Sequence, residues 1–233
     1  MKYIKKIDAV ISKITDLTKT AKELKLTLSE PLPFIAGEFI NIFLEHNGQE
    51  FRRAFSISSD DENNKEINLS IRLTLNGAVT PLFWQEDFTG CKVKVMGPLG
   101  LNTADKMFSN KIYLFGFGIG AGVVKALATH HLRNDNLQSL TIITGNRSET
   151  EIVHQDYFDG LKNDGRVTVQ YAISDSVPNS LNLKGYIQDH LFGYDFNNAD
   201  VYICGQVVAC EALKAKINEY RPVNCAFFVE AFH

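Results

Sequence analysis

The sequence predicts two domains, an N-terminal antiparallel β-barrel followed by a C-terminal α/β domain built on a parallel sheet. Residues 4–95 of the 233-residue chain carry short β patterns throughout, whereas from residue 111 onward strand-like apolar segments alternate with helical ones. A polar, turn-rich stretch separates the two patterns. Short, regularly spaced strands are typical of closed barrels, and strand–helix alternation is typical of parallel sheets. We therefore expect domains at residues 1–104 and 105–233.

In the first half, six short runs with a β pattern predict the barrel strands. They cover residues 4–14, 23–29, 39–45, 51–58, 66–73 and 92–95. Residues 77–87 predict a single short helix that opens at a glycine-containing turn, and the N-terminus of such a helix can receive a phosphate. The Gly97-Pro98-Leu99-Gly100 stretch and the polar residues after it predict the linker to the second domain.

In the second half, the pattern predicts four strands, four helices and a closing apolar segment. The strands cover residues 111–115, 140–144, 167–173 and 200–204, and the helices cover residues up to 132, 149–162, 186–191 and 207–220. Residues 225–232 form the closing segment. Ligands of such sheets bind at the carboxyl ends of the strands, where residues 116–122, 145–147 and 204–206 lie.

Residues 111–132 read as a strand, a glycine turn and a helix, with Gly116, Gly118 and Ala121 fitting the pattern G-x-G-x-x-G/A. Such a turn leaves backbone N–H groups bare at a helix N-terminus, which favours a bound phosphate. The alternative is a turn that only lets the helix pack tightly on the sheet. The next strand ends in Gly145, Asn146 and Arg147 without an acid, so an ordinary Rossmann dehydrogenase is disfavoured.

The composition argues against several partners and sites. A net charge of −3 gives no basic field for nucleic acid, no stretch reaches the 18 apolar residues of a membrane span, and the Lys-rich start lacks the apolar run of a signal peptide. The four scattered cysteines predict reduced thiols and a cytoplasmic protein. Neither these cysteines nor the six histidines have the spacing of a zinc or iron–sulfur site, so we expect no metal.

The motif Arg53-Ala54-Phe55-Ser56 at the end of a barrel strand, ahead of a parallel α/β domain, resembles the ferredoxin–NADP reductase-like flavoproteins. This family includes flavodoxin, cytochrome b5 and free-flavin reductases. The resemblance implies that Arg53 meets the flavin phosphate, that Phe55 lies against the flavin ring, and that Ser56 reaches the ring near N5. The alternative is an ordinary amphipathic strand with Phe55 in the core and Ser56 in water.

Two further stretches of the first half are similar to family motifs. Ile71-Arg72 followed by Gly77-Ala78-Val79-Thr80 is similar to a strand and G-x-x-[ST] turn that holds the flavin pyrophosphate with backbone N–H groups and a hydroxyl. Residues 97–100 are similar to the G-P-x-G that closes the flavin domain. Taken singly, both are turns that any barrel can contain.

In the second half, Gly116-Phe117-Gly118-Ile119-Gly120 and the following Ala121 resemble the family's G-T-G-I-x-P, which implies contact with the pyrophosphate of a nicotinamide dinucleotide. Phe117 replaces the usual threonine and Ala121 the usual proline. A bulky Phe117 is expected to narrow the path of the nicotinamide to the flavin.

The stretch from Gly145 to Glu149 resembles the family segment near the adenosine ribose. Arg147 and Ser148 are candidates to hold a 2′-phosphate, but Glu149 and Glu151 would repel one. The choice between NADH and NADPH therefore stays open.

Two segments near the C-terminus complete the resemblance. Cys204-Gly205-Gln206 resembles C-G-P, whose cysteine lies beside the nicotinamide carbon that gives up hydride, although Gln206 replaces the proline. A buried core cysteine is the alternative for Cys204. Residues 228–233 resemble the segment over the other face of the flavin, which implies that Glu230 relays a proton and Phe232 covers the ring.

The resemblance implies a FAD-dependent NAD(P)H reductase, with NADPH or NADH as substrate and hydride transfer to N5 of FAD. The electrons would pass to a separate protein, such as a ferredoxin, a flavodoxin or an oxygenase component, or to free flavin itself. The alternative from another class is a non-catalytic nucleotide-binding module that regulates a partner complex, because Phe117, Ala121 and Gln206 depart from the family pattern.

Overall fold

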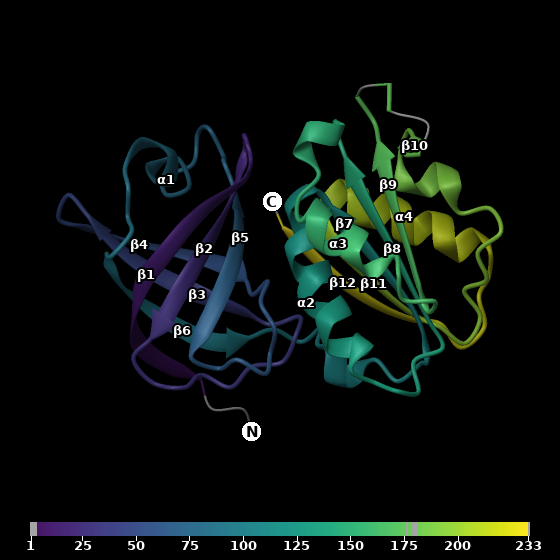
Figure 1. Ribbon diagram of the computed structural model, residues 1–233, viewed down its shortest axis with the longest axis horizontal. Coiled ribbons are helices and arrows are strands. Elements are labelled where there is room, and N and C mark those ends of the chain that lie inside the picture. Colours follow the sequence, from purple (N-terminus) through teal and green to yellow (C-terminus); the bar gives the residue numbers. More distant parts are fainter. Residues whose placement is uncertain (1–3, 176, 179–180, 233) are drawn as a thin grey trace. The chain divides into compact units, whose positions relative to one another are not determined.

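The computed structural model of the chain describes residues 4–175, 177–178 and 181–232. The chain forms two compact units, residues 1–103 and 104–233 (Figure 1). None of the helices in the described ranges combines the length and the apolar character needed to cross a membrane.

The N-terminal unit is a six-stranded antiparallel sheet with the strand order β4-β3-β6-β1-β2-β5. Its strands are β1 (Lys5–Thr18), β2 (Ala21–Leu28), β3 (Phe39–His46), β4 (Gln49–Ser56), β5 (Glu66–Arg72) and β6 (Lys92–Leu99). The sheet curls until its two ends meet at a bridge between Ile57 and Leu69. The Ser58 N–H also donates to the Asn68 carbonyl at 2.8 Å. The predicted antiparallel barrel is therefore confirmed as a curled sheet.

Alternation along the strands explains the curl. In β5 the side chains of Ile67, Leu69 and Ile71 are buried, while the residues between them are more exposed. Because successive side chains of a strand point to opposite faces, this pattern gives the sheet one apolar face that must be covered. Because the sheet curls, its apolar face packs against itself. The buried side chains of β1, β2, β3 and β6 belong to the same core.

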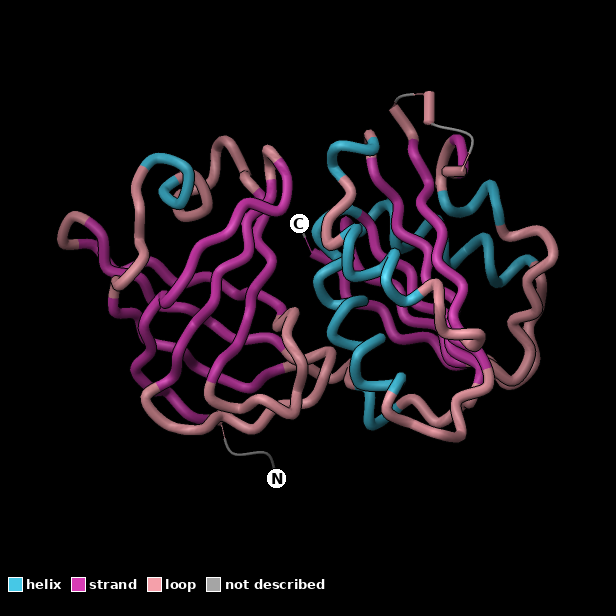
Figure 2. Tube along the Cα trace, viewed as in Figure 1, coloured by secondary structure: helices cyan, strands magenta, loops and turns pink. Residues whose placement is uncertain are grey.

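Two predictions for this unit were wrong. The helix expected over residues 77–87 is limited to the four residues of α1 (Leu82–Gln85), drawn in cyan in Figure 2. A tight turn precedes it, in which the Gly77 N–H donates to the Thr74 carbonyl and the Thr74 N–H donates to Thr80 Oγ1. No helix N-terminus therefore opens at Gly77. The predicted linker also starts too early, because β6 continues to Leu99, which pairs with Phe39 of β3.

The C-terminal unit is a six-stranded parallel sheet with the order β10-β9-β8-β7-β11-β12. Its strands are β7 (Lys111–Phe117), β8 (Ser139–Asn146), β9 (Val167–Ile173), β10 (Leu183–Lys184), β11 (Asp200–Gln206) and β12 (Ala226–Phe232). Its helices are α2 (Ala121–Leu132), α3 (Gln155–Leu161) and α4 (Val207–Glu219). Figure 1 shows α2 and α3 on one face of the sheet and α4 on the other. Covered faces explain why the central strands read as nearly continuous apolar runs.

The helix predicted over residues 149–162 is divided in the structure. A 3₁₀ turn, η3 (Glu149–Glu151), comes first, and α3 starts only after His154. His154 has φ of 59°, a left-handed conformation that an α-helix cannot contain, so the helix cannot run through it. The helix predicted over residues 186–191 is likewise a 3₁₀ turn, η4 (Ile187–His190).

A close backbone approach joins the start of α2 to the end of β11. A Cβ atom on Gly120 would lie 2.3 Å from the carbonyl oxygen of Cys204, a distance that side chains do not tolerate. Gly205 has φ of 149°, and a Cβ atom there would lie 2.6 Å from Cβ of Phe117. Both positions therefore require glycine.

This contact gives the first prediction. Gly120→Ala is expected to destabilise the C-terminal unit by about 2 kcal/mol or more, because the new methyl group meets backbone that cannot move aside. Urea unfolding followed by helical circular dichroism measures this, since α2, α3 and α4 all lie in this unit.

Gly160→Ala is the matched control. Gly160 lies within α3, and no atom lies within 4 Å of a Cβ placed there. This substitution is expected to stabilise the unit by about 0.5–1 kcal/mol. If Gly120→Ala unfolds at the same urea concentration as the unaltered protein, the close approach does not constrain the fold.

Candidate functional site

The parallel sheet has one point where the direction of strand addition reverses. From β7 the chain adds β8, β9 and β10 in one direction, and it then returns to place β11 on the other side of β7. In open α/β sheets, ligands bind outside the carboxyl ends of the strands at such a switch point. The glycine turn after β7 and Gly205 near the end of β11 lie there.

The glycine turn forms the start of α2. Phe117 ends β7, a 3₁₀ turn η2 (Gly118–Gly120) follows, and α2 begins at Ala121. Gly118 has φ of 54°, which favours glycine. The N-terminal cap of α2 makes no side-chain hydrogen bond, and no acid stands in the first turn. Its N–H groups and the positive end of its dipole therefore suit a phosphate.

Phe117 is a packing residue of this turn. A Cβ atom on Gly145 would lie 3.0 Å from Cδ1 of Phe117, and Gly205 approaches Phe117 from the β11 side. The half-buried ring packs against the core that Ile187 and the apolar side chains of β11 share. The aromatic residue found in place of a threonine thus fills the space between the ends of β8 and β11.

Cys204 is fully buried and lies directly opposite Gly116 of β7. Burial, together with the nearby Glu230 and Cys210, raises the pKa of its thiol well above the ordinary value. The thiol is therefore protonated at neutral pH. The side chain lies in the core, as the alternative interpretation expected, and contact of this thiol with a nicotinamide stays a prediction.

Glu230 lies on β12 directly opposite Cys204. The hydroxyl of Tyr202 donates a hydrogen bond to its Oε2 atom at 2.7 Å. Burial and the carboxylate raise the pKa of Tyr202 well above the ordinary value, so this hydroxyl remains a donor. The bond fixes the Glu230 carboxylate near the carboxyl end of the sheet. Phe232 lies further along β12, opposite Gln206, and His233 lies outside the described residues.

Sequence reasoning missed Tyr202. The signal was the alternation of β11, which puts Tyr202 and Cys204 on the same face of the sheet. The hydrogen bond to Glu230 could not be found without the pairing of β11 with β12.

Asp175, which sequence reasoning did not consider, lies just after β9, next to the residues that follow β8. The Asp175 N–H donates to the Arg147 carbonyl at 2.9 Å, which continues the pairing of the two strands past Ile173. Nε of Arg147 lies 4.0 Å from Oδ2 of Asp175. We call Arg147, Ser148 and Asp175 the β8–β9 tip. Arg147 is exposed there, and Ser148 exchanges a hydrogen bond with Thr150 at 3.0 Å.

In the N-terminal unit, Arg53 and Arg52 diverge as the strand alternation requires. Arg53 is exposed on β4, a strand at the end of the sheet, and donates to the Arg52 carbonyl at 2.7 Å. Arg52 instead donates from Nε to Asn41 Oδ1 at 3.1 Å, and its guanidinium lies 5.9 Å from the Phe43 ring centroid. Of these two arginines, Arg52 has a side-chain acceptor for its guanidinium, whereas the hydrogen bond described for Arg53 goes to a backbone carbonyl.

The other residues of the motif are placed differently. Ala54 is exposed, and Phe55 packs partly against the barrel core. Ser56 is half-buried at the last position of β4, opposite Phe39. Phe55 thus combines a packing role with partial exposure, as an aromatic side chain at the rim of a core does.

The turn before α1 offers a ligand mostly backbone atoms. The side chains of Ile71 and Val79 are buried in the barrel core, so only their backbone atoms are available to a ligand. Arg72 donates from Nη1 to Thr20 Oγ1 at 3.0 Å. Thr80 Oγ1 accepts from the Thr74 N–H and keeps its own proton to donate. Gly77 and Ala78 lie between these residues in the turn.

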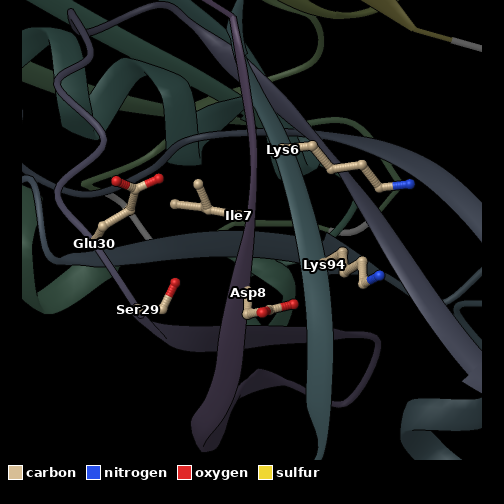
Figure 3. A pocket seen from close by; sticks show the side chains of 6 residues that line it. All are labelled: Lys6, Ile7, Asp8, Ser29, Glu30 and Lys94. Carbon is tan, nitrogen blue, oxygen red and sulfur yellow. The ribbon is translucent and has the colours of Figure 1, made fainter.

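A shallow depression of 360 Å³ on the barrel is a separate feature (Figure 3). It is lined by Lys6, Ile7, Asp8, Ser29, Glu30 and Lys94. The Lys6 ammonium already lies 3.7 Å from the Phe43 ring centroid, and Glu30 forms an ion pair with Lys5. Its mixed charges favour no one class of ligand, and none of the residues predicted to bind flavin lines it.

Within the described part of the chain, no group of three or more His, Cys, Asp or Glu side chains is arranged to hold a metal ion.

Comparisons with known proteins find one known domain in each half of the chain. The model of the oxidoreductase FAD-binding domain matches residues 8–103, and that of the oxidoreductase NAD-binding domain matches residues 114–214. Among solved structures, the cytochrome P450 reductase GcoB of Amycolatopsis superposes with a TM-score of 0.82 at 21% sequence identity, over 98% of this chain and 71% of that chain.

Two curated relatives match nearly the whole chain. The reductase component of phenol 2-monooxygenase from Pseudomonas sp. strain CF600 is 27% identical over 232 residues, which cover 96% of this chain and 65% of that protein. A probable flavin reductase from Aliivibrio fischeri is 22% identical over 235 residues, which cover 97% of this chain and 98% of that protein. The chain thus spans slightly less than two thirds of the first relative. With an oxidoreductase FAD-binding domain followed by an oxidoreductase NAD-binding domain, the chain belongs to the ferredoxin–NADP reductase-like flavoproteins.

Proposed function

We propose that the chain is a FAD-dependent NAD(P)H reductase that passes hydride from NADH or NADPH to N5 of FAD and delivers the electrons to a separate acceptor. The observation that carries the proposal is the union of the two oxidoreductase domains in one chain, with a glycine cradle at the switch point of the second. Bound FAD would supply the redox chemistry, and the protein supplies binding, orientation and electrostatics.

The residues of the C-terminal unit fit a dinucleotide. The uncapped N–H groups at the start of α2 offer donors to a pyrophosphate, and the turn that leads to them contains Gly118 at a positive φ of 54°. Cys204 and Gly205 lie beside this cradle, where we propose that the nicotinamide ring binds. The Ile119 backbone and the β8–β9 tip complete the proposed nucleotide site.

The residues of the N-terminal unit fit a flavin nucleotide. The exposed guanidinium of Arg53 suits a phosphate, because charge-assisted hydrogen bonds from arginine recognise phosphate oxygens. The backbone of the turn at Gly77 and Ala78, with the Thr80 hydroxyl, offers donors to a pyrophosphate. Ser56 is the proposed donor near N5, and the partly exposed Phe55 is the proposed ring contact.

Glu230 and Phe232 belong to the same proposal. The Tyr202 hydroxyl holds the Glu230 carboxylate in one position, which suits a group that accepts and returns a proton. Phe232 lies at the end of the same strand and offers an aromatic surface to a flavin ring.

The acceptor is proposed from the relatives. A reductase component of a monooxygenase hands electrons to another component, so a separate acceptor protein, such as a ferredoxin, a flavodoxin or an oxygenase component, is the first proposal. Free flavin is the second, because the relative that this chain covers almost from end to end is a probable flavin reductase. Scattered, free cysteines support a cytoplasmic location.

The proposal as a whole predicts a yellow protein whose flavin bleaches under anaerobic conditions when NADH or NADPH is added. Absorbance spectroscopy of the purified chain measures flavin content, reduction and nucleotide preference in one titration. Flavin that is lost on gel filtration, with activity restored by added flavin, would favour the flavin reductase. A colourless protein that neither binds added FAD nor oxidises either nucleotide would favour the non-catalytic nucleotide-binding module.

Arg53→Ala is expected to weaken FAD binding by about tenfold to a hundredfold, the loss of a charged hydrogen-bond partner being about 1.5–3 kcal/mol. Fluorescence titration with FAD measures this. Arg52→Ala is the matched control, because the Arg52 guanidinium is engaged by Asn41 on the other face of the strand. Equal losses in the two variants, or an equal loss of NAD(P)H binding in Arg53→Ala, would refute the assignment.

Ser56→Ala is expected to slow flavin reduction by about tenfold while FAD stays bound, because one hydrogen bond near N5 is lost. Anaerobic stopped-flow absorbance measures the rate of reduction. Ser12→Ala is the control, because the exposed Ser12 hydroxyl donates to the Lys25 carbonyl. Ser12 lies on β1, which β3 and β6 separate from β4 in the strand order. An unchanged rate in Ser56→Ala removes Ser56 from the mechanism.

A further inference from the structure

We propose that the Phe117 ring fills the space at the strand ends that a nicotinamide ring would need, so that the chain holds a dinucleotide by its ADP-ribose half. The nicotinamide ring then enters only when the Phe117 ring moves away. The inference rests on the proposed function of the C-terminal unit as a nicotinamide nucleotide site and deepens it, because it names the side chain that determines which half of the dinucleotide contributes to binding.

The strand register places Phe117 in a row of small residues at the carboxyl ends of the strands. Gly145 of β8 is the register partner of Phe117 and of Ala172 in β9, and Gly205 of β11 is the register partner of Ala231 in β12. The row two residues earlier on the same face carries large side chains, namely Ile143, Phe115, Ile203 and Val229. The sheet therefore becomes thinner at its carboxyl edge, and Phe117 adds a ring where its neighbours have little or no side chain.

The two glycines beside Phe117 give the ring its place. A Cβ atom on Gly145 would lie 3.0 Å from Cδ1 of Phe117 and 3.3 Å from Cδ1 of Ile187. On the other side, a Cβ atom on Gly205 would lie 2.6 Å from Cβ of Phe117. The side chain of Phe117 thus fits between the ends of β8 and β11 because neither neighbour has a side chain. It is half-buried there, against the core that contains Ile187.

A nicotinamide ring and the Phe117 ring compete for this space. Cys204 and Gly205, beside which we propose that the nicotinamide binds, directly adjoin Phe117 across the pairing of β7 with β11. Both rings are flat and gain from contact with the same apolar surface. Entry of the nicotinamide therefore costs the contacts of the Phe117 ring, and its affinity falls with the fraction of molecules in which that ring is displaced. The N–H groups at the start of α2 belong to the backbone, so the pyrophosphate is not affected.

The test is isothermal calorimetry of the full chain with NAD⁺ and with ADP-ribose, which lacks the nicotinamide ring. We expect the unaltered chain to bind the two compounds within about threefold, because the nicotinamide gains little. Phe117→Val removes the ring and keeps a side chain that suits the end of a strand. In this variant we expect the preference for NAD⁺ over ADP-ribose to rise at least about threefold, with the affinity for ADP-ribose nearly unchanged.

Two control variants separate the ring from its packing. Phe117→Tyr keeps the ring and should bind NAD⁺ and ADP-ribose in the same ratio as the unaltered chain. Phe227→Val removes a ring that is partly buried against the same core, but Phe227 lies near the start of β12, opposite Val201. It should also leave the ratio unchanged. Circular dichroism of each variant establishes that it is folded.

Binding of NAD⁺ by the unaltered chain more than about threefold tighter than binding of ADP-ribose overturns the inference. A smaller rise of the ratio in Phe117→Val than in the expectation above overturns it as well. If Phe117→Val does not fold, the comparison in the unaltered chain decides alone. Absence of binding of both compounds by the unaltered chain and by every folded variant overturns the proposed nucleotide site itself, and with it the inference.

Discussion

The close approach of Gly120 to the Cys204 carbonyl is the constraint on which the C-terminal unit depends. It lets the turn after β7 cross the end of β11, so that the N-terminus of α2 lies at the point where the strand order reverses. A side chain at Gly120 would push α2 away from β11 and move its N–H groups from the carboxyl ends of the strands. The proposed phosphate cradle thus depends on backbone packing as much as on glycine content.

The same crossing determines which side chains are left for chemistry. Phe117 and Cys204 lie at the crossing and are used for packing, since one fills the space between β8 and β11 and the other is fully buried. Polar side chains with defined partners lie elsewhere on the strands. Glu230 accepts a hydrogen bond from the Tyr202 hydroxyl, and Arg147 lies near the Asp175 carboxylate. The departure from the family motif at Phe117 therefore affects the packing of the glycine turn.

The sequence predicted what depends on local alternation and missed what depends on distant pairing. Five of the barrel strands were predicted within a few residues because a period of two is visible in the sequence, but the extension of β6 to Leu99 needs its pairing with Phe39. The break before α3 depends on the left-handed conformation of His154, and the two-residue strand β10 depends on its pairing with Ile173. Tyr202 and Asp175 were missed for the same reason, since each acquires its partner from a neighbouring strand.

Recognition in the C-terminal unit is thereby divided between backbone and side chains. In the proposed nucleotide site, the backbone turn at Gly118 and Gly120 would accept any pyrophosphate, because N–H groups and a helix dipole do not distinguish the nucleotides attached to it. Discrimination must come from side chains that meet the part in which the nucleotides differ, and the 2′ position of the adenosine ribose is that part for NADH and NADPH. In the proposed nucleotide site, those side chains belong to the β8–β9 tip and not to the glycine turn, so separate parts of the chain meet the two requirements.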